Sequence, residues 1–424
     1  MTTPRRVAIV GGNRIPYCRA HTAYSELGNE QMMTAAMRGL VDRFALTGQR
    51  LGDVALGAVM THPNDWNLAR ESTLGSGLSP ETPAFDIRRA CGTSLESVIL
   101  IANKIALGQI DAGIAGGVDT ISGTPILYDE DYRRLLLESS RARKTSERLK
   151  SFLKVRPRHF KPVVPGVVEP RTGLSMGQSC EVMAKEWQIS RQAQDELALA
   201  SHERLALAYD AGFYEDLVSP FEGVSEDNTL RRSTTMDKLA ALKPVFDRDN
   251  GTLTAGNSTP LTDGAGCVLL ASEEWARERG LPIQAYLAHV EVAAVDFVGG
   301  EGLLMAPAYA VSRMLDKAGL GLQDFDRYEI HEAFAAQVLC TLAAWESEDF
   351  CRNRLERDAP LGSVDRDRMN IHGGSIAAGH PFGATGARIV ATLAKDLSAT
   401  DAQRGLVSVC TGGGMGVTAI LESA

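Results

Sequence analysis

The sequence lacks any Cys-x-x-Cys pair, and its seven cysteines are scattered at positions 18, 91, 180, 267, 340, 351 and 410. An odd, unpatterned count excludes a disulfide framework and suits a reducing compartment. No His/Cys/Asp group has the spacing of a zinc site, so no metal is expected. No Gly-x-Gly-x-x-Gly lies at the first strand-to-helix turn, which argues against a nicotinamide cofactor.

Long apolar runs are absent as well. No stretch of 18 apolar residues occurs, and the chain passes from Arg5-Arg6 directly into the short apolar run Val7–Val10. Neither a membrane span nor a signal segment is therefore expected, and the predicted location is the cytoplasm. The formal charge of −9 argues against nucleic-acid binding.

What is present is an alternation of strands and helices. Strands are predicted at 7–10, where Gly11-Gly12 end the run, and at 57–60, 83–87 and 112–119, with helices at 29–46 and 95–105. This order predicts an α/β domain with a largely parallel sheet. The sheet is expected to resume near Thr252, and a second α/β run starts near Ile283. The two runs have a related order, but no sequence repeat proves a duplication.

Residues 120–240 interrupt this alternation of strands and helices. From Arg133 to Lys161 eleven Lys and Arg stand against two Glu, a local charge of +9, so the rest of the chain carries −18. Leu149, Phe152 and Leu153 add a narrow apolar stripe. This segment is either a solvated helical face, a surface for cofactor phosphates, or an amphipathic element that touches a membrane or an acidic partner. We expect the insertion to be draped over the sheet domains.

The most informative turn is Ala90-Cys91-Gly92-Thr93-Ser94, between a short strand and a mostly buried helix. A cysteine at a helix start meets unpaired N–H groups and the positive end of the helix dipole, and both favour the reactive thiolate. Gly92 is expected to keep the approach to the sulfur open. The alternative is a buried structural cysteine, as most free cysteines are.

Three further residues stand at strand ends in turns of small residues. His380 lies in a loop packed with glycine, Cys410 precedes three glycines, and His331 begins a helix. A single histidine or cysteine is usually structural. Two of each in such turns are typical of a catalytic site.

Five motifs now occur in a fixed order: C-G-T-S at Cys91, N-S-T-P-L-T-D-G-A at 257–265, H-E-A-F-A at 331–335, G-G-S-I-A-A-G-H-P-F-G-A-T-G at 373–386 and C-T-G-G-G-M-G at 410–416. On these motifs the chain resembles the thiolases over nearly its whole length. His331 stands where the family commonly has Asn. With the basic insertion, this variant resembles the thiolase of the trifunctional fatty-acid oxidation complex and its bacterial counterparts.

The resemblance implies a fold of two similar α/β halves, with central sheets in α-β-α-β-α layers and a loop domain inserted in the first half. The N-terminal half would comprise residues 1–120 and 241–271, the loop domain 121–240, and the C-terminal half 272–424.

The resemblance also implies a reaction, the CoA-dependent cleavage of a 3-ketoacyl-CoA to acetyl-CoA and a shortened acyl-CoA, as in fatty-acid β-oxidation. Cys91 would attack the 3-keto carbon and carry the acyl group as a thioester. His380 would be the base, and Cys410 would protonate the enolate. One oxyanion hole would be formed by His380 and a water held by His331, the other by the N–H groups of Cys91 and Gly412.

CoA is thus expected as a substrate and no other cofactor is expected. It would lie on the loop domain, contacting Met176 and Thr259, with basic side chains near its phosphates. The implied assembly is a homodimer or a dimer of dimers. Residues 133–161 would contact an enoyl-CoA hydratase/3-hydroxyacyl-CoA dehydrogenase subunit or a membrane surface.

Two other functions stay open on the sequence. One is a condensing enzyme, either a short-chain acetoacetyl-CoA thiolase or a ketoacyl synthase. Synthases use two histidines with the cysteine, and Cys410 argues against them. The other is a non-catalytic lipid-binding relative, which would have lost catalytic side chains that are all present here.

Overall fold

The computed structural model describes residues 4–166 and 168–424. Across these residues ten strands form a sheet in the order β4-β3-β5-β6-β1-β7-β10-β9-β8, and β2 pairs with β6. The strands are β1 Val7–Arg14, β2 Cys18–Arg19, β3 Asp53–Leu56, β4 Ala84–Asp86, β5 Ala112–Asp119, β6 Thr262–Ser272, β7 Ala285–Ala294, β8 Arg327–Ile330, β9 Arg404–Thr411 and β10 Met415–Ser423.

The sheet consists of two halves with the same pairing pattern. In the first half β3–β5 is parallel, and β5–β6 and β6–β1 are antiparallel. In the second half β8–β9 is parallel, and β9–β10 and β10–β7 are antiparallel. The halves join through a short pairing of β1 with β7. A duplication that the sequence did not prove is thus visible in the topology, and the prediction of a largely parallel sheet is wrong.

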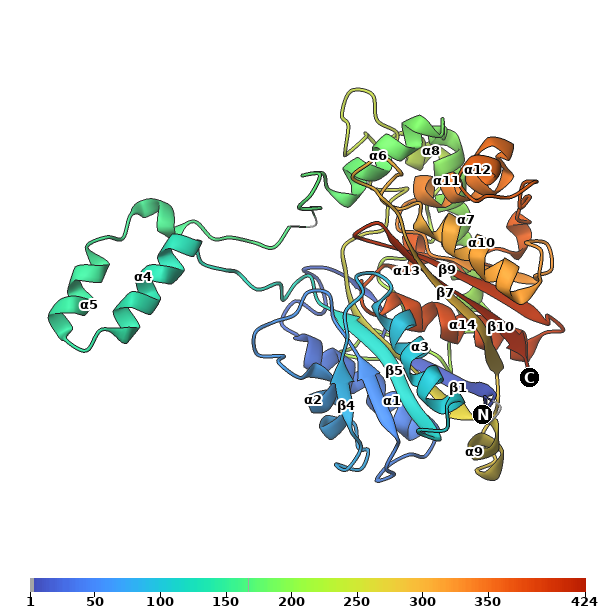
Figure 1. Cartoon of the computed structure of the whole chain (residues 1–424), viewed down its shortest axis with the longest axis horizontal. Coiled ribbons are helices and arrows are strands. Elements are labelled where there is room, and N and C mark those ends of the chain that lie inside the picture. The colour runs from blue at the N-terminus through green and yellow to red at the C-terminus, as the bar shows by residue number, and fades with distance from the viewer. Residues whose placement is uncertain (1–3, 167) are drawn as a thin grey trace.

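Helices complete five layers (Figure 1). Helices α1, α2 and α9 cover the outer face of the first half, α3 and α14 lie between the halves, and α10 and α11 cover the outer face of the second half. This arrangement confirms the predicted α-β-α-β-α order. The helices are α1 Asn29–Arg43, α2 Leu68–Gly75, α3 Thr93–Ala106, α4 Glu130–Arg141, α5 Thr145–Phe152, α6 Met176–Glu186, α7 Arg191–Asp210, α8 Met236–Ala240, α9 Glu273–Glu278, α10 Ala306–Ala318, α11 Ala335–Glu346, α12 Glu348–Asn353, α13 Ser375–Ala378 and α14 Thr385–Ala399.

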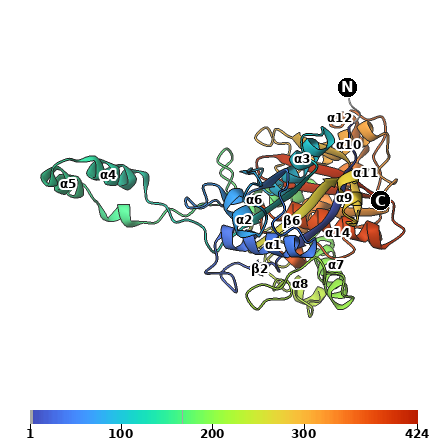
Figure 2. The ribbon, with the colours of Figure 1, turned by 90° about the horizontal axis from the view of Figure 1, so that it is seen from below.

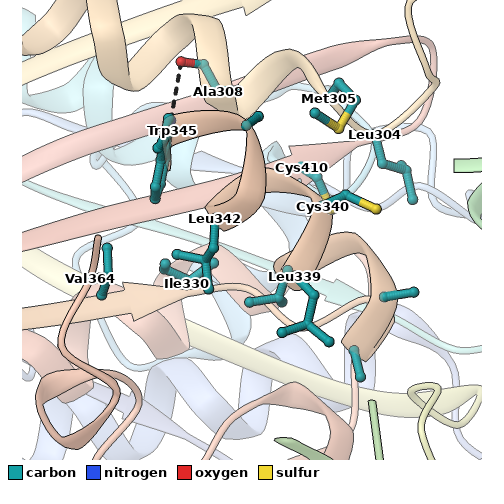
Figure 3. Packing of buried hydrophobic residues seen from close by; sticks show 14 of the residues in the cluster. Leu304, Met305, Ala308, Ile330, Leu339, Cys340, Leu342, Trp345, Val364 and Cys410 are labelled. Carbon is teal, nitrogen blue, oxygen red and sulfur yellow. Dashed lines mark hydrogen bonds between the residues drawn. The ribbon is translucent and has the colours of Figure 1, made fainter. Parts of the chain in front are cut away.

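The apolar side chains form three buried clusters. One lies on the outer face of each half-sheet and one lies between the halves. The middle cluster is built from α3, α14 and the inner faces of both half-sheets. Helix α14 is buried on almost every side because it packs between two sheets. In the outer cluster of the second half, Trp345 is fully buried and its Nε1 donates to the Ala308 carbonyl at 3.4 Å (Figure 3). Cys410 belongs to the same cluster, so the second half holds this thiol in a rigid, dry setting.

The inserted segment has two different parts. Helices α6 and α7 pack on α11 and α13 of the second half, as the draped arrangement predicted. Residues 124–164, which we call the arm, instead project from the body as a hairpin of α4 and α5 followed by a 3-10 turn, Pro157–Phe160 (Figures 1 and 2). The prediction that the whole insertion covers the sheets is therefore wrong for the arm. Leu153, directly after α5, is 81% exposed.

Several predicted boundaries also move. Strand β1 continues through Gly11 and Gly12 to Arg14, because both glycines pair with β6. The strand expected at 57–60 lies at Asp53–Leu56 instead. The sheet resumes at Thr262 and not near Thr252. Across residues 4–166 and 168–424 no helix is long and apolar enough to cross a membrane.

Candidate active site

Cys91 is presented by a strained turn between β4 and α3. Ala90 has a φ of 42°, a region that residues with a side chain rarely occupy. The Thr93 hydroxyl holds this turn, because it accepts from the Arg89 N–H at 2.9 Å and donates to the Ala90 carbonyl at 2.7 Å. Cys91 is the residue immediately before Gly92, the N-cap of α3, so this turn fixes its position at the helix start.

Gly92 has a packing role that the sequence did not predict. A Cβ at this position would lie 2.8 Å from the Val417 side chain and 2.9 Å from that of Thr411. Both residues belong to the second half of the sheet. The missing side chain thus allows the turn of the first half to pack closely against the second, in addition to any effect on access to the sulfur.

The second half supplies the other thiol beside Cys91. Cys410 lies at the end of β9, is 1% exposed, and is close enough for its pKa to be raised by Cys91. In the turn that follows, the backbone N–H of Gly412 stabilises the thiolate of Cys91. The two sulfurs and the Gly412 amide, predicted from separate motifs, therefore meet in one place.

His331 and His380 form a close pair with ring centroids 4.2 Å apart. His331 follows β8, and its N–H donates to the Ser408 carbonyl, two residues before Cys410 on β9, at 2.8 Å. The His380 N–H donates to the Thr262 hydroxyl at 3.1 Å. Because Gly379 has a φ of 93°, the loop can turn sharply just before His380.

Each ring is fixed through its Nδ1 atom. Nδ1 of His331 lies 2.8 Å from Ser375 Oγ, and Nδ1 of His380 lies 2.5 Å from Thr385 Oγ1. Both Nε2 atoms are buried without a partner within the described part of the chain. A buried nitrogen without a hydrogen-bond partner lowers the stability of the fold, so two of them in one pair are typical of a site that binds a ligand.

Burial shifts the pKa of each of these four side chains in the direction that favours its uncharged form. Burial raises the pKa of Cys91 to about 12, although the Gly412 N–H opposes the shift. Burial, assisted by Cys91, also raises the pKa of Cys410. Burial lowers the pKa of His380 to about 3, with the Arg388 charge adding to the effect, and it lowers the pKa of His331 as well. The expectation that the helix start makes Cys91 a thiolate is wrong, because desolvation exceeds the helix effect.

Asp119 ties the loops of the two halves together. It is the last residue of β5, and its carboxylate accepts from the Gly383 N–H and the Met60 N–H, each at 2.6 Å. Gly383 lies in the loop after His380, so a first-half acid holds the second-half histidine loop. Burial raises the pKa of Asp119 to about 6.

A cavity of about 630 Å³ adjoins the histidine loop. Thr259 lines it and donates its hydroxyl to the Ser375 carbonyl at 3.0 Å, which connects the cavity wall to the partner of His331. Arg19, Arg231 and Lys238 line the same cavity and make it basic. Thr259 therefore lies in the wall of a basic cavity, and its contact with CoA stays a prediction.

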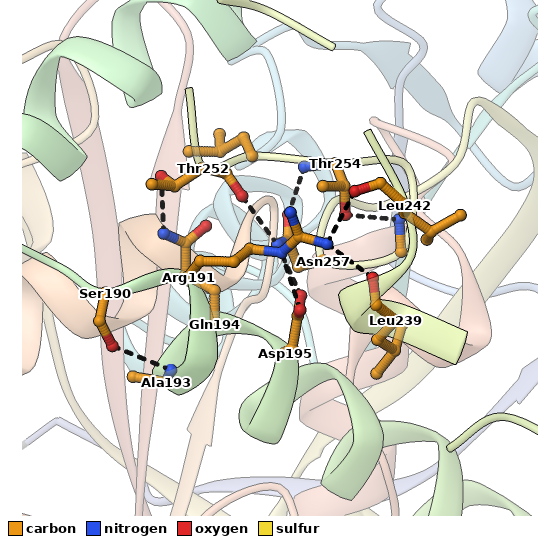
Figure 4. A network of polar contacts seen from close by, with 12 residues as sticks. Ser190, Arg191, Ala193, Gln194, Asp195, Leu239, Leu242, Thr252, Thr254 and Asn257 are labelled. Atoms are coloured by element: carbon orange, nitrogen blue, oxygen red, sulfur yellow. Dashed lines mark hydrogen bonds and ion pairs between the residues drawn. The ribbon is translucent and has the colours of Figure 1, made fainter. Parts of the chain in front are cut away.

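The Thr259 loop is held by a buried polar network (Figure 4). Asn257 donates to Asp195 of α7 at 2.9 Å and accepts from the Thr254 N–H at 2.7 Å. Arg191 donates to the same Asp195 at 2.7 Å. Met176, the other predicted contact, does not line the cavity. Its Sδ lies 3.6 Å from the position of a Cβ built on Gly412, so it flanks the cysteines instead.

Sequence reasoning missed four residues of this site: Asp119, Ser375, Thr385 and Arg388. The last three lie within or directly after the quoted motif that contains His380, so the signal was present without a role attached. Asp119 was visible as the acid that ends a strand before the insertion.

One group outside this site has metal-ligating atoms in reach of one another. Asp129, Asp131 and His159 of the arm bring their ligand atoms within 4.8 Å. However, Nδ1 of His159 accepts from the Arg156 N–H at 3.2 Å, so the proton of the neutral ring resides on Nε2. This tautomer disfavours metal coordination, and the expectation that the chain needs no metal stays a prediction.

Two half-sheets of the same pairing pattern, with Cys91 of the first half near Cys410 of the second, define a duplicated α/β protein with a paired-cysteine centre. The chain belongs to the thiolase family. The family models described as "Thiolase, N-terminal domain" and "Thiolase, C-terminal domain" match residues 7–274 and 281–423.

Similar proteins cover the chain almost completely. It is 40% identical to the 3-ketoacyl-CoA thiolases of Yersinia pestis (strain Pestoides F) and Yersinia pseudotuberculosis (serotype O:3, strain YPIII), over 98% of this chain and 97% of each relative. The crystal structure of the Bacillus anthracis acetyl-CoA acetyltransferase matches with a TM-score of 0.84 and 28% identity over 100% of both chains. That of human mitochondrial 3-ketoacyl-CoA thiolase in complex with CoA matches with a TM-score of 0.82 and 27% identity over 99% of this chain and 98% of the other.

Proposed function

We propose that this protein is a 3-ketoacyl-CoA thiolase that cleaves its substrate with CoA to acetyl-CoA and an acyl-CoA shortened by two carbons. The observation that carries the proposal is the meeting of Cys91 and Cys410 beside the Gly412 amide, on the framework that holds the two histidines. Cleavage of a carbon–carbon bond by this route needs a nucleophile, a base and a proton donor, and the site offers one side chain for each.

In the first half-reaction the Cys91 proton passes to His380 and the sulfur attacks the 3-keto carbon. The bond between C2 and C3 then breaks, which leaves an acyl thioester on Cys91 and the enolate of acetyl-CoA. Cys410 gives its proton to the enolate carbon. Its raised pKa keeps it a thiol, which is the form a proton donor needs.

Before the second half-reaction the proton on His380 returns to the Cys410 thiolate, which restores both groups. His380 then takes the thiol proton of CoA, the CoA sulfur attacks the thioester carbonyl, and the shortened acyl-CoA forms. Cys91 leaves as a thiolate and recovers its proton from His380. Burial disfavours the Cys91 thiolate and the His380 imidazolium when either charge forms by itself. Proton transfer creates both charges together, and their attraction in the dry pocket offsets part of the desolvation cost.

CoA is proposed to occupy the basic cavity. Its phosphates would meet Arg19, Arg231 and Lys238, and its pantetheine arm would pass Thr259 toward the histidine pair. This location agrees with the expectation that CoA lies on the loop domain. Met176 would contact the acyl end, because it flanks Gly412 and not the cavity.

The test is CoA-dependent cleavage of acetoacetyl-CoA and of a long-chain 3-ketoacyl-CoA, with the Cys91→Ala variant as the control. Preference for the long substrate supports the degradative function. Cleavage of the short substrate alone supports the short-chain thiolase that works in the condensing direction. Cleavage of neither supports the non-catalytic relative and contradicts the proposal.

The assembly and the arm belong to the same proposal. We infer a homodimer or dimer of dimers in the cytoplasm, which light scattering would contradict by finding a monomer. The arm carries exposed Leu149, Phe152 and Leu153 together with a charge of +9 between residues 133 and 161. Apolar side chains beside a basic surface suit an anionic membrane or an acidic hydratase–dehydrogenase subunit.

A further inference from the structure

The two histidines of the site are chemically alike, yet thiolysis needs one proton acceptor and one hydrogen-bond donor. Their Nδ1 partners differ, and this difference decides which nitrogen of each neutral ring carries the proton. The assignment follows from counting the hydrogen bonds that each hydroxyl can make.

For His380 the deciding residue is Thr385. Its Oγ1 lies 2.5 Å from His380 Nδ1 and 3.1 Å from the Pro381 carbonyl, to which it donates. The hydroxyl has one proton, so it must accept from the imidazole, and Nδ1 carries the ring proton. The Nε2 atom, buried without a partner in the described chain, therefore presents a lone pair to the site.

For His331 the deciding residues are Ser375 and Arg388. Arg388 donates from Nη2 to Ser375 Oγ at 2.9 Å, and a guanidinium can only donate. The Ser375 hydroxyl lies 2.8 Å from His331 Nδ1, which is its sole acceptor among the described contacts. The serine therefore donates to Nδ1, and the proton of the neutral ring resides on Nε2, which is also buried and unpartnered.

We propose that Thr385 and the Ser375–Arg388 pair are positioning residues that hold the two histidines in opposite tautomers, with His380 Nε2 as the base and His331 Nε2–H as a direct oxyanion donor. This inference rests on the proposed function and deepens it, because His331 then needs no intervening water. Arg388 is 3% exposed, its Nε and Nη1 have no partner in the described chain, and its charge disfavours protonation of both rings. Burial is the main reason that the pair stays neutral, and the arginine charge adds to it.

The experiment is nitrogen NMR of ¹⁵N-histidine-labelled full-length protein, which distinguishes an N–H from a bare ring nitrogen at each position. His331→Asn and His380→Asn variants identify the signals. The proposal expects the proton on Nδ1 of His380 and on Nε2 of His331. The same tautomer in both rings, the reverse assignment, or a charged ring at neutral pH would overturn it.

Matched variants add a kinetic readout. Thr385→Val removes the hydroxyl at nearly constant shape, whereas Thr385→Ser keeps it. We expect Thr385→Val to mix the His380 tautomers and lower kcat about tenfold with KM unchanged, as the loss of one hydrogen bond would, and Thr385→Ser to restore both. Ser375→Ala should mix the His331 tautomers without altering those of His380. An unchanged spectrum in Thr385→Val and Ser375→Ala would refute the positioning role even if the wild type is an active thiolase. Absence of thiolysis by the wild type would instead refute the proposed function.

Discussion

The two halves of the sheet have the same framework but deliver different chemistry. In the first half, the turn before the central helix α3 presents Cys91. In the second half, the loop before the central helix α14 presents His380, and the end of β9 adds Cys410. Because α3 and α14 pack on each other, with Ser94 of α3 accepting from the Ala387 N–H of α14 at 2.9 Å, both turns open onto one site.

The difference teaches how a duplicated fold can become an asymmetric site. The two similar frameworks place two helix starts beside each other. The turn before one helix carries the proposed nucleophile, and the turn before the other carries the proposed base. The central layer gives precision, because it is packed on both sides and cannot shift easily. Substitutions that remove one half's contribution at a time therefore separate the two roles.

The largest effect is expected from the first half. Cys91→Ala should lower thiolysis by more than about 10⁴-fold, because the covalent route disappears. Thermal unfolding should change little, since the substitution removes a single atom from a half-buried residue. A steady-state assay beside a melting curve checks this, and residual activity within tenfold of wild type would exclude Cys91 as the nucleophile.

The next effect comes from the second half. His380→Asn should lower kcat by about 10²- to 10⁴-fold, as the loss of a general base does. Because the base also generates the nucleophile, alkylation of Cys91 by iodoacetamide should slow in the same variant. The rate of alkylation, followed by peptide mass spectrometry, provides the measurement. Unchanged alkylation together with full turnover would mean that the second half supplies no base.

Within the second half, replacing His331, the proposed hydrogen-bond donor, should lower kcat less than replacing His380, the proposed base. His331→Ala should lower kcat by about 10²- to 10³-fold, because one oxyanion donor is lost. His331→Asn should retain more activity, since an amide N–H can donate in place of the imidazole Nε2–H. The two variants are compared under identical conditions. Equal losses in both would show that hydrogen-bond donation is not what His331 contributes.

Two buried acids extend the comparison to stability. Burial raises the pKa of Asp119 in the first half to about 6, although several backbone N–H groups donate to it, and it raises the pKa of Glu329 on β8 to about 8. A carboxyl with a raised folded pKa binds more protons folded than unfolded, so its contribution to stability falls as the pH rises from about 4.5 to about 8. Glu329→Gln should therefore gain stability relative to wild type across that range. Urea unfolding at pH 5 and pH 8 measures this, and a gain that shrinks with pH would contradict the assignment.

The smallest effect on catalysis is expected from the arm. Replacing Arg141, Arg143, Lys144 and Lys150 with Gln should leave thiolysis of acetoacetyl-CoA within about twofold, because the arm stands apart from the body. Cosedimentation with anionic vesicles, or with a hydratase–dehydrogenase subunit, should weaken, at about 1 kcal/mol per charge near a membrane surface. If both kinds of binding stayed unchanged, the arm would have no such role.

Much of this molecule could be predicted from its sequence, because the signals were local. Small-residue turns at strand ends identified Cys91, His331, His380 and Cys410, and helix periodicity identified α3. Contacts between the halves could not be predicted. The role of Gly92 depends on Val417, and the Nδ1 partners of the histidines depend on how the α13 and α14 turns fold back.

Two errors have a common physical cause. The helix start suggested a thiolate at Cys91, but the degree of burial that opposes it is a tertiary property. The parallel sheet was inferred from alternation, but β6 returns after the long insertion and pairs antiparallel with β5 and β1. Both the burial of Cys91 and the direction of strand pairing depend on residues far away in the sequence, so local patterns do not reveal them.

The most direct measurement is intact-protein and peptide mass spectrometry after the protein is mixed with a 3-ketoacyl-CoA and no free CoA. The account predicts one acyl group per chain, located on Cys91, which disappears when CoA is added. An acyl group on Cys410 or any other residue, or full turnover of CoA by a protein that never carries an acyl group, would contradict it.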